Sequence, residues 1–379
     1  MNKNMCKRIA ILSIIIKVLM TSCSSTEDLL YNPDTLTQVE FKVPQNMIKG
    51  DEIKTEIYTI HEMECIDSIL VILSEKPNAF ISVIDCKNDS IIAQFGNLGH
   101  AKDEFIDSPK SMYWEKEANG NITLYCQDLI KSVTKVINLT ESIKRNKCIL
   151  INEIKHDYQG IDFQYFHLDK DGNSHICRKF VTFDDPRDNI YYPPSFLIKD
   201  KTNRIQTIEL YPKIISNDLV GVLYSAYFDI LHLSPDKTKF VQAFNCLDLF
   251  NIIDVRTHSV NGYIGFNSYD FELFQELETI EEANEKMHLF YQDVCVTNSS
   301  IITLKDGRNI REQKEGKKHQ FQIYIFDWYG NILSSYFIDR ELVQIALDKI
   351  IFTEIESLDI TEDILFKCAC LAKENSKAK

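Results

Sequence analysis

The sequence predicts an all-β protein made of repeated four-stranded units, and three observations support this prediction. Residues typical of strands are abundant, with 17 Tyr and 22 Phe among 379 residues. The apolar runs are short and are separated by turn residues. One pattern recurs along the chain: an apolar run, an Asp, a few polar residues and a second alternating run. We therefore expect strands throughout, arranged as an internal repeat.

Each copy of this pattern predicts a β-hairpin in which the Asp side chain accepts hydrogen bonds from the backbone of the turn that follows it. Five copies occur, at Asp85, Asp128, Asp200, Asp254 and Asp327. The intervals between them are 43, 72, 54 and 73 residues. Such spacing suits a four-stranded unit, with insertions in the two longer intervals, and indicates a β-propeller.

The number of strands predicts six blades over residues 37–379. After Asp327, only three more strands are expected, at Val343–Leu347, Ile350–Ile355 and Ile364–Leu371. The missing strand of this last blade is predicted at Thr37–Val43. An N-terminal strand would then close the ring and protect the sheet edges at the two ends of the chain.

The N-terminus has the anatomy of a lipoprotein signal peptide. A basic start precedes the apolar run Ile9–Met20, and small residues precede Cys23. An uncleaved membrane helix is the alternative, but the run is too short for a span and contains Lys17. We expect a signal peptide at residues 1–22 and a lipidated Cys23 that begins a polar tether, residues 23–36. These features predict a lipid-anchored protein of the bacterial cell envelope, and we expect it at the outer membrane.

Charge and cysteine content exclude several classes of function. The formal net charge is −14, and removal of the signal, which carries four basic residues and no acid, leaves −18. A nucleic-acid partner is therefore not expected, because phosphate binding relies on Lys and Arg. The nine cysteines other than Cys6 and Cys23 include no Cys-x-x-Cys pair, so we expect small buried side chains and no zinc or redox centre.

Motifs for catalysis and cofactor binding are missing or incomplete. The sequence has no Gly-x-Ser-x-Gly elbow, no Walker loop and no dinucleotide fingerprint. The segment His61–Cys65 begins like a zinc-peptidase motif but lacks the second His. Asp169–Asn173 has the acid spacing of a calcium loop without the closing Glu, and we expect a tight turn there with Gly172 at positive φ. We predict no catalytic residue, metal site or cofactor.

The strongest candidate for a ligand site is the glycine-rich segment Phe95–Phe105, which contains His100, Asp103 and Glu104. In a propeller, loops between blades lie at a ring face, where an imidazole and two carboxylates could bind a ligand. The alternative is that Gly96 and Gly99 let the chain cross between blades and that the polar groups satisfy the turn. Four further histidines lie in strand-like segments and are either packed, exposed or directed into a central channel: His167, His175, His232 and His258.

Two segments in the long intervals are expected to decorate the ring. Thr279–Glu282 matches a capping box and predicts a helix at one rim. Residues 310–320 mix both signs of charge and predict a solvated loop.

The chain resembles the TolB-like six-bladed propeller lipoproteins of bacterial envelopes. The resemblance lies in Cys23, in the crossing segment Phe95–Pro109, in Leu233–Asp236 and in Ile325–Asn331, and it covers nearly the whole mature chain. Lys237 departs from the family pattern, because Gly usually follows the Asp at this turn. The resemblance implies the fold but no catalytic residue.

Two functions follow from these expectations. The first is a monomeric, membrane-tethered, non-enzymatic propeller that binds a peptide, a glycan or a protein partner. The alternative is a metal-dependent lyase or hydrolase with acids and histidines around the axial channel. We favour the first, because no catalytic constellation is present in the sequence.

Overall fold

A computed structural model of the chain describes the part of the sequence that forms the ring. The described residues are 33–48, 50–52, 57, 60–156, 163–169, 172–179, 195–208, 229–265, 279–315, 317, 321–338 and 366–368. Within these ranges, no helix is both long and apolar enough to cross a membrane. Cys23 and the signal peptide lie outside the described residues, so both stay predictions.

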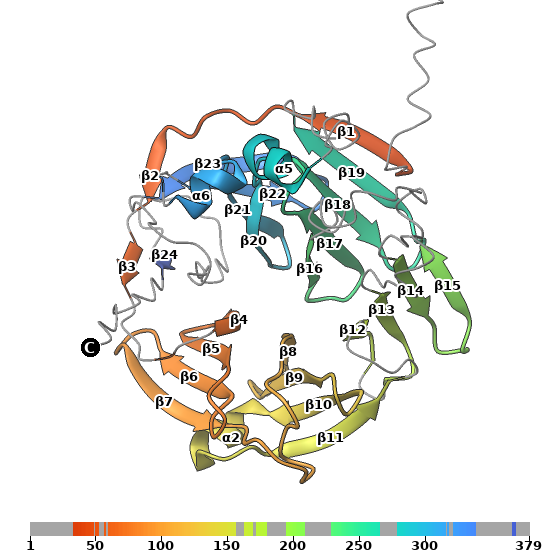
Figure 1. The fold of residues 1–379 in the computed structure, drawn as a ribbon. Helices are drawn as coiled ribbons and strands as arrows, with labels where there is room; N and C mark the ends of the chain where they lie inside the picture. Colours follow the sequence, from red (N-terminus) through yellow and green to blue (C-terminus); the bar gives the residue numbers. More distant parts are fainter. Residues whose placement is uncertain are drawn as a thin grey trace, which may run out of the picture.

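Five four-stranded antiparallel blades stand around a central axis (Figure 1). We label the strands of each blade A to D in chain order, from the axis outward. Blade 1 consists of β4 (Ile60–Ile66), β5 (Ile69–Ser74), β6 (Ile81–Asp85) and β7 (Ser90–Phe95). Blade 2 consists of β8 (Met112–Lys116), β9 (Ile122–Asp128), β10 (Val133–Asn138) and β11 (Leu150–Lys155).

The remaining three blades follow the same order. Blade 3 consists of β12 (Phe163–His167), β13 (His175–Lys179), β14 (Ser195–Lys199) and β15 (Ile205–Ile208). Blade 4 consists of β16 (Asp229–Leu233), β17 (Lys239–Phe244), β18 (Leu249–Asp254) and β19 (Val260–Gly265). Blade 5 consists of β20 (Tyr291–Val296), β21 (Ser300–Lys305), β22 (Gln322–Asp327) and β23 (Ile332–Ile338). The all-β propeller of four-stranded blades is thereby confirmed.

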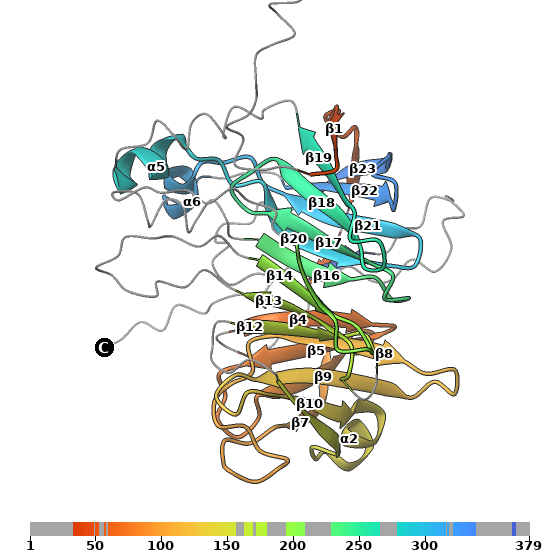
Figure 2. The same ribbon diagram turned by 90° about the vertical axis from the view of Figure 1, so that its right-hand side faces the viewer.

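The ring has two distinct faces, because successive strands of a blade are antiparallel. The A–B and C–D connections lie at one end of the strands, which we call the A–B face. The B–C connections and the crossings to the next blade lie at the other end, which we call the B–C face. The helices α5 (Ile280–Lys286) and α6 (Ile310–Lys314) belong to connections of the B–C face and lie together there (Figure 2).

The Asp-based turns are confirmed at all five positions. The carboxylate of Asp327, for example, accepts the backbone N–H groups of Tyr329 and Asn331, both at 2.9 Å. Four of the five close C–D turns, but Asp128 closes the B–C turn of blade 2. The C–D connection of blade 2 is instead the helix α2 (Leu139–Arg145), capped by Asn138 through the N–H of Glu141. Asp128 follows strand B of its blade, whereas Asp200 follows strand C. The interval between them therefore contains one additional strand, and only the rest of its extra length is an insertion.

Closure of the ring differs from the expectation for Thr37–Val43. The first strand, β1 (Thr35–Val39), pairs parallel with β19 and adds a fifth strand to blade 4. β2 (Asn46–Ile48) adds to β23 in the same way, and β3 (Gly50–Glu52) pairs with β24 (Phe366–Cys368). The prediction that Thr37–Val43 completes the last blade was wrong, because Thr37–Val39 belongs to β1 and covers the open edge of blade 4. An N-terminal strand does meet a C-terminal strand, at β3 and β24, which lie between blades 5 and 1 (Figure 1).

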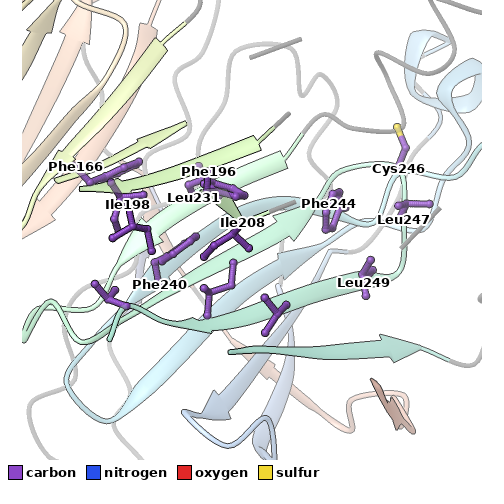
Figure 3. Packing of buried hydrophobic residues seen from close by; sticks show 14 of the residues in the cluster. Phe166, Phe196, Ile198, Ile208, Leu231, Phe240, Phe244, Cys246, Leu247 and Leu249 are labelled. Atoms are coloured by element: carbon purple, nitrogen blue, oxygen red, sulfur yellow. The ribbon is translucent and has the colours of Figure 1, made fainter. Parts of the chain in front are cut away.

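The hydrophobic core lies between adjacent blades and not at the axis. Between blades 3 and 4, Phe166 and Phe196 pack against Phe240, with Phe196 and Phe240 ring centroids 5.2 Å apart (Figure 3). Because each strand packs on both of its faces, strands such as β9 and β21 are buried along their whole length. Of the seven cysteines that the structure describes, Cys65 and Cys295 are half-buried and the other five are buried, as expected for small apolar side chains: Cys86, Cys126, Cys148, Cys177 and Cys246.

Two local predictions are confirmed and one is corrected. Thr279 caps α5 by accepting the N–H of Glu282 at 3.1 Å, and the helix decorates one rim. Gly172 adopts a φ of +73° in its tight turn. The charged segment 310–320 is not only a loop, because its first residues form α6; Asn309 accepts the N–H of Glu312 at 2.7 Å and starts this short helix.

Candidate functional site

A cavity of about 460 Å³ lies on the ring axis, enclosed by the inner strands of the five blades. β4, β8, β16 and β20 each contribute several residues, and β12 contributes Phe166. The turn residues in its wall, Ser234–Lys237, Thr297 and Asn298, belong to A–B connections. The mouth of the cavity is therefore at the A–B face.

The polar groups in the wall are mainly acidic. Five carboxylates, two ammonium groups and one imidazole line the cavity: Glu62, Glu64, Glu115, Asp236, Asp293, Lys116, Lys237 and His232. Two contacts between side chains connect blades that are not neighbours. His232 Nδ1 of blade 4 lies 3.8 Å from Glu64 Oε1 of blade 1, and Lys237 of blade 4 pairs with Glu115 of blade 2.

Lys237 occupies an unusual backbone position for a residue with a long side chain. Its φ is +58°, in the left-handed region that favours glycine. Its ammonium group pairs with Glu115 and also donates to the carbonyl oxygen of His167 at 3.1 Å, so one side chain joins blades 2, 3 and 4. Backbone strain of this kind concentrates at functional sites. The residue that departs from the family pattern thus contributes to the cavity wall.

The turn that carries Lys237 is held by Asp236. Burial alone would raise the pKa of this carboxyl group, but hydrogen bonds from Ser234 and Thr238 outweigh it and lower the pKa. The Ser234 hydroxyl donates to Asp236 Oδ1 at 2.7 Å, and the N–H of Thr238 donates to the same oxygen at 3.0 Å. Asp236 therefore stays ionised and fixes the mouth of the cavity.

Aromatic side chains form a firm wall on the side of blade 2. Trp114 and Tyr113 both line the cavity. Tyr113 stacks on Tyr125 with a centroid distance of 4.5 Å and an interplanar angle of 6°, and its hydroxyl accepts the N–H of His167 at 3.0 Å. Burial raises the pKa of Tyr113 well above its ordinary value. Tyr113 therefore positions the wall and cannot supply a phenolate.

Sulfur lines the part of the wall that blades 1 and 5 form. Cys65 of β4 and Cys295 of β20 both face the cavity. The neighbouring thiol of Cys86, together with burial, raises the pKa of Cys65 far above its ordinary value. Because the thiolate is the reactive form, Cys65 has no nucleophilic character here.

Of the four strand histidines, only His232 reaches the cavity. His167 and His175 are buried where blades 2 and 3 meet, and His258 lies in the C–D turn of blade 4 with a φ of +62°. Burial lowers the pKa of His167 to about 3, and the nearby His156 and His175 add to this effect. His167 is therefore neutral, with Nε2 3.0 Å from Thr134 Oγ1. Among the described residues, no three His, Cys, Asp or Glu side chains are placed to hold a metal ion together.

His100, Asp103 and Glu104 lie away from the cavity, in the crossing from β7 to β8 at the B–C face. Glu104 folds back on its own loop, where its Oε2 accepts the N–H of Ala101 at 2.9 Å. Lys131 Nζ donates to the carbonyl oxygens of Ala101 and Glu104, at 3.0 and 2.9 Å. His100 is exposed. Ligand binding by these three residues stays a prediction.

Sequence motifs do not identify the acidic part of the cavity. The segment His61–Cys65 indicates only an incomplete zinc motif. In the structure its residues Glu62 and Glu64 line the cavity, together with Met63 and Cys65. The usable signal was its position as the first strand of a blade, because that strand faces the axis in every blade.

Comparison with known proteins agrees with this architecture. The family model described as "TolB-like 6-blade propeller-like" matches residues 54–349. The chain belongs to this family. No curated protein sequence matches the chain significantly. The family description names six blades, and the described residues form five four-stranded blades and the two-stranded pair of β3 and β24.

Solved structures with related folds are distant in sequence. A Bacteroides fragilis protein described as exported is 13% identical, with a TM-score of 0.46 and 79% of each chain covered. A DUF4221 family member from Bacteroides vulgatus is 12% identical, with a TM-score of 0.47, and the match covers 74% of this chain and 82% of that one. Virginiamycin B lyase from Staphylococcus aureus is 11% identical, with a TM-score of 0.34, and the match covers 74% and 71%.

Proposed function

We propose that the chain is a lipid-anchored, non-enzymatic binding protein of the bacterial envelope, and that its ligand enters the axial cavity from the A–B face. The ligand is a short peptide, a glycan or an extended loop of a partner protein. The anchor is Cys23, supported by the signal-like sequence before it.

The cavity is the observation that carries this proposal. Its volume of about 460 Å³ lies within the usual range for ligand pockets. Its wall combines an indole, Trp114, with carboxylates such as Glu62 and Glu64. Aromatic faces and precisely placed polar groups are the common means of binding sugars and peptides.

A metal-dependent lyase or hydrolase is the second candidate, and His232 with Glu64 is the observation that favours it. An imidazole beside a carboxylate can act as a general base. A catalytic metal centre commonly needs at least three protein ligands in total, however, and the described residues do not provide such a group. Metal analysis of the purified chain separates the two candidates, because a stoichiometric bound cation would support the enzyme.

Tryptophan fluorescence tests the binding proposal directly. The chain has only two tryptophans, so a Trp328→Phe variant reports on Trp114 alone. We expect the emission of Trp114 to shift in a saturable way with at least one member of a panel of defined oligosaccharides and short peptides. A Glu64→Gln change should weaken that response, and the control Lys102→Gln at the B–C face should not. No response to any probe, in a folded protein, would contradict the proposal.

A further inference from the structure

The point at which the N-terminal segment joins the ring fixes which face can meet the membrane. β1 runs parallel to β19, and β19 begins directly after the C–D turn of blade 4. Asp34 Oδ2 accepts the N–H of Val260, the first residue of β19, at 2.7 Å. The chain therefore enters the ring at the A–B face, the face that carries the cavity mouth.

The chain between the proposed anchor and the ring is short. Cys23 lies ten residues before Pro33, the first described residue, so the two can be at most about 35 Å apart. A seven-residue strand such as β4 is about 23 Å long, which approximates the height of the ring. If the B–C face lay on the bilayer, the chain would have to run along the side of the ring, and about 23 Å of its maximum length of about 35 Å would be needed for this. With the A–B face toward the bilayer, no such crossing is needed.

Exposed apolar side chains gather at the same end of the blades. Among the described residues, ten large apolar side chains are strongly exposed. Seven of them lie in a C–D turn or near the end of an outermost strand that points to the A–B face. These seven are Leu36, Ile91, Ile92, Ile151, Ile205, Tyr329 and Leu333. Every blade contributes at least one, counting Leu36 on the edge of blade 4. Tyr329, at 77%, is the most exposed. Apolar and aromatic side chains in such a ring are suited to the bilayer interface.

From these observations we propose that the A–B face docks on the surface of the bilayer that holds the Cys23 lipid, so that the cavity mouth opens toward the membrane. Contact is made by the apolar side chains of the rim and not by charge, because the mature chain carries a formal charge of −18. The preferred surface is therefore a zwitterionic one. A ligand that is itself attached to the membrane would have direct access to the mouth. This inference rests on the lipid anchor of the proposed function.

The two faces can be distinguished with tryptophan reporters. Trp328 lies in the C–D turn of blade 5, where its Nε1 donates to the carbonyl oxygen of Thr297 at 3.0 Å, and so marks the A–B face. A Trp114→Phe variant leaves it as the single reporter. Ile130, exposed in the B–C turn of blade 2, provides the matched reporter when Ile130→Trp is combined with Trp114→Phe and Trp328→Phe.

The experiment measures quenching by brominated phosphatidylcholine in vesicles that carry the full mature protein. We expect Trp328 to be quenched several-fold more strongly than the Ile130→Trp reporter. Replacement of Ile205 and Leu333 by Ser should reduce this difference, whereas replacement of Leu98 by Ser at the B–C face should not. Equal quenching of both reporters, quenching of neither, or stronger quenching at position 130 would each overturn the docking proposal.

Flotation of the protein with the vesicles tests the anchor separately. A chain that does not float has no lipid anchor, and this result would refute the anchor part of the proposed function. Quenching is then measured at saturating vesicle concentration with the unanchored chain. Docking of the A–B face still predicts selective quenching of Trp328 under these conditions, and its absence would refute the docking proposal as well.

Discussion

The crossing loop at residues 96–105 and the axial cavity both collect polar side chains, but they use them in opposite ways. In the loop, the charged groups bind backbone: Glu104 accepts a loop N–H, and Lys131 and Lys135 donate to loop carbonyl oxygens. In the cavity, Asp236 also binds the backbone of its own turn, but Glu64, Glu115, His232 and Lys237 come from three different blades and contact one another around open space. The loop contacts therefore contribute to stability, whereas the cavity is the site that we propose for a ligand.

The largest expected effect is a loss of stability when a buried contact to the crossing loop is removed. Lys135 is fully buried, and its Nζ donates to Lys102 O at 2.5 Å and to Glu153 Oε1 at 2.8 Å. A Lys135→Met change leaves both acceptors without this partner, and we expect the free energy of unfolding to fall by about 3 to 5 kcal/mol. Denaturant unfolding measures this value. The matched control Lys102→Met, at an exposed side chain, should change it by less than about 0.5 kcal/mol.

The wall behind the cavity should instead be sensitive to acid. Because the pKa of His167 is lowered to about 3 in the folded state, the unfolded chain, with its ordinary pKa near 6.5, binds a proton first as the pH falls. The contribution of neutral His167 is therefore complete above about pH 6.5 and is lost progressively toward pH 3. At pH 4.5 the loss is about 3 kcal/mol.

This pH dependence can be assigned by substitution. His156 and His175 lie beside His167, with ring centroids at 6.2 and 6.0 Å, and Lys237 approaches from the A–B turn of blade 4. A His167→Gln variant should show a shallower loss of stability between pH 6.5 and 4.5 in denaturant titrations at fixed pH. The exposed His100, changed to Gln, should keep the wild-type slope; a wild-type slope in the His167 variant would exclude this assignment.

A binding measurement compares the two regions directly. Once a ligand of the cavity is in hand, Glu64→Gln should raise its Kd about tenfold, because a charged hydrogen-bonding group is lost from the wall. His100→Ala and Asp103→Ala in the crossing loop should leave the Kd unchanged. A raised Kd in the two loop variants and an unchanged Kd in Glu64→Gln would instead place the ligand site in the loop, as the sequence predicts.

The smallest effect is expected at Lys237. A Lys237→Gly change relieves the backbone strain of a φ of +58° but removes the ion pair with Glu115. Unlike the fully buried Lys135, Lys237 is partly exposed and its partner Glu115 lines the cavity, where water can solvate the carboxylate once the ammonium group is removed. Both effects are then about 1 kcal/mol, so the free energy of unfolding should change by less than about 1 kcal/mol. Thermal unfolding tests this. A stability loss of several kcal/mol would instead mean that Lys237 serves mainly as a structural link between blades.

Local patterns in the sequence predicted local structure well. The Asp turns, the Thr279 cap of α5 and the turn at Gly172 were all predictable, because each depends on a few neighbouring residues and on known turn chemistry. The placement of Thr37–Val43 was not, because parallel pairing of β1 with β19 joins residues more than 220 positions apart. Nothing within the strand specifies which open edge it covers.

The residues that line the cavity could not be predicted from the sequence for the same reason. Glu64, Trp114 and His232 come from three blades, and their proximity depends on how the blades are arranged around the axis. In contrast, His100, Asp103 and Glu104 stand out in the sequence because they are neighbours in a glycine-rich turn. A cluster within one loop often satisfies that loop, whereas the ligand-facing groups of a propeller are collected one or two per blade.

The claim that the cavity is the ligand site is tested most directly by photo-crosslinking within the bacterial envelope. A photoreactive phenylalanine analogue is placed at position 114 in the cavity and, in a separate variant, at position 100 in the crossing loop. Mass spectrometry of the tryptic peptides then locates any covalent adduct. We predict a defined ligand adduct on the peptide that contains position 114 and none on the peptide that contains position 100. An adduct at position 100 alone, or at both positions equally, would contradict the account.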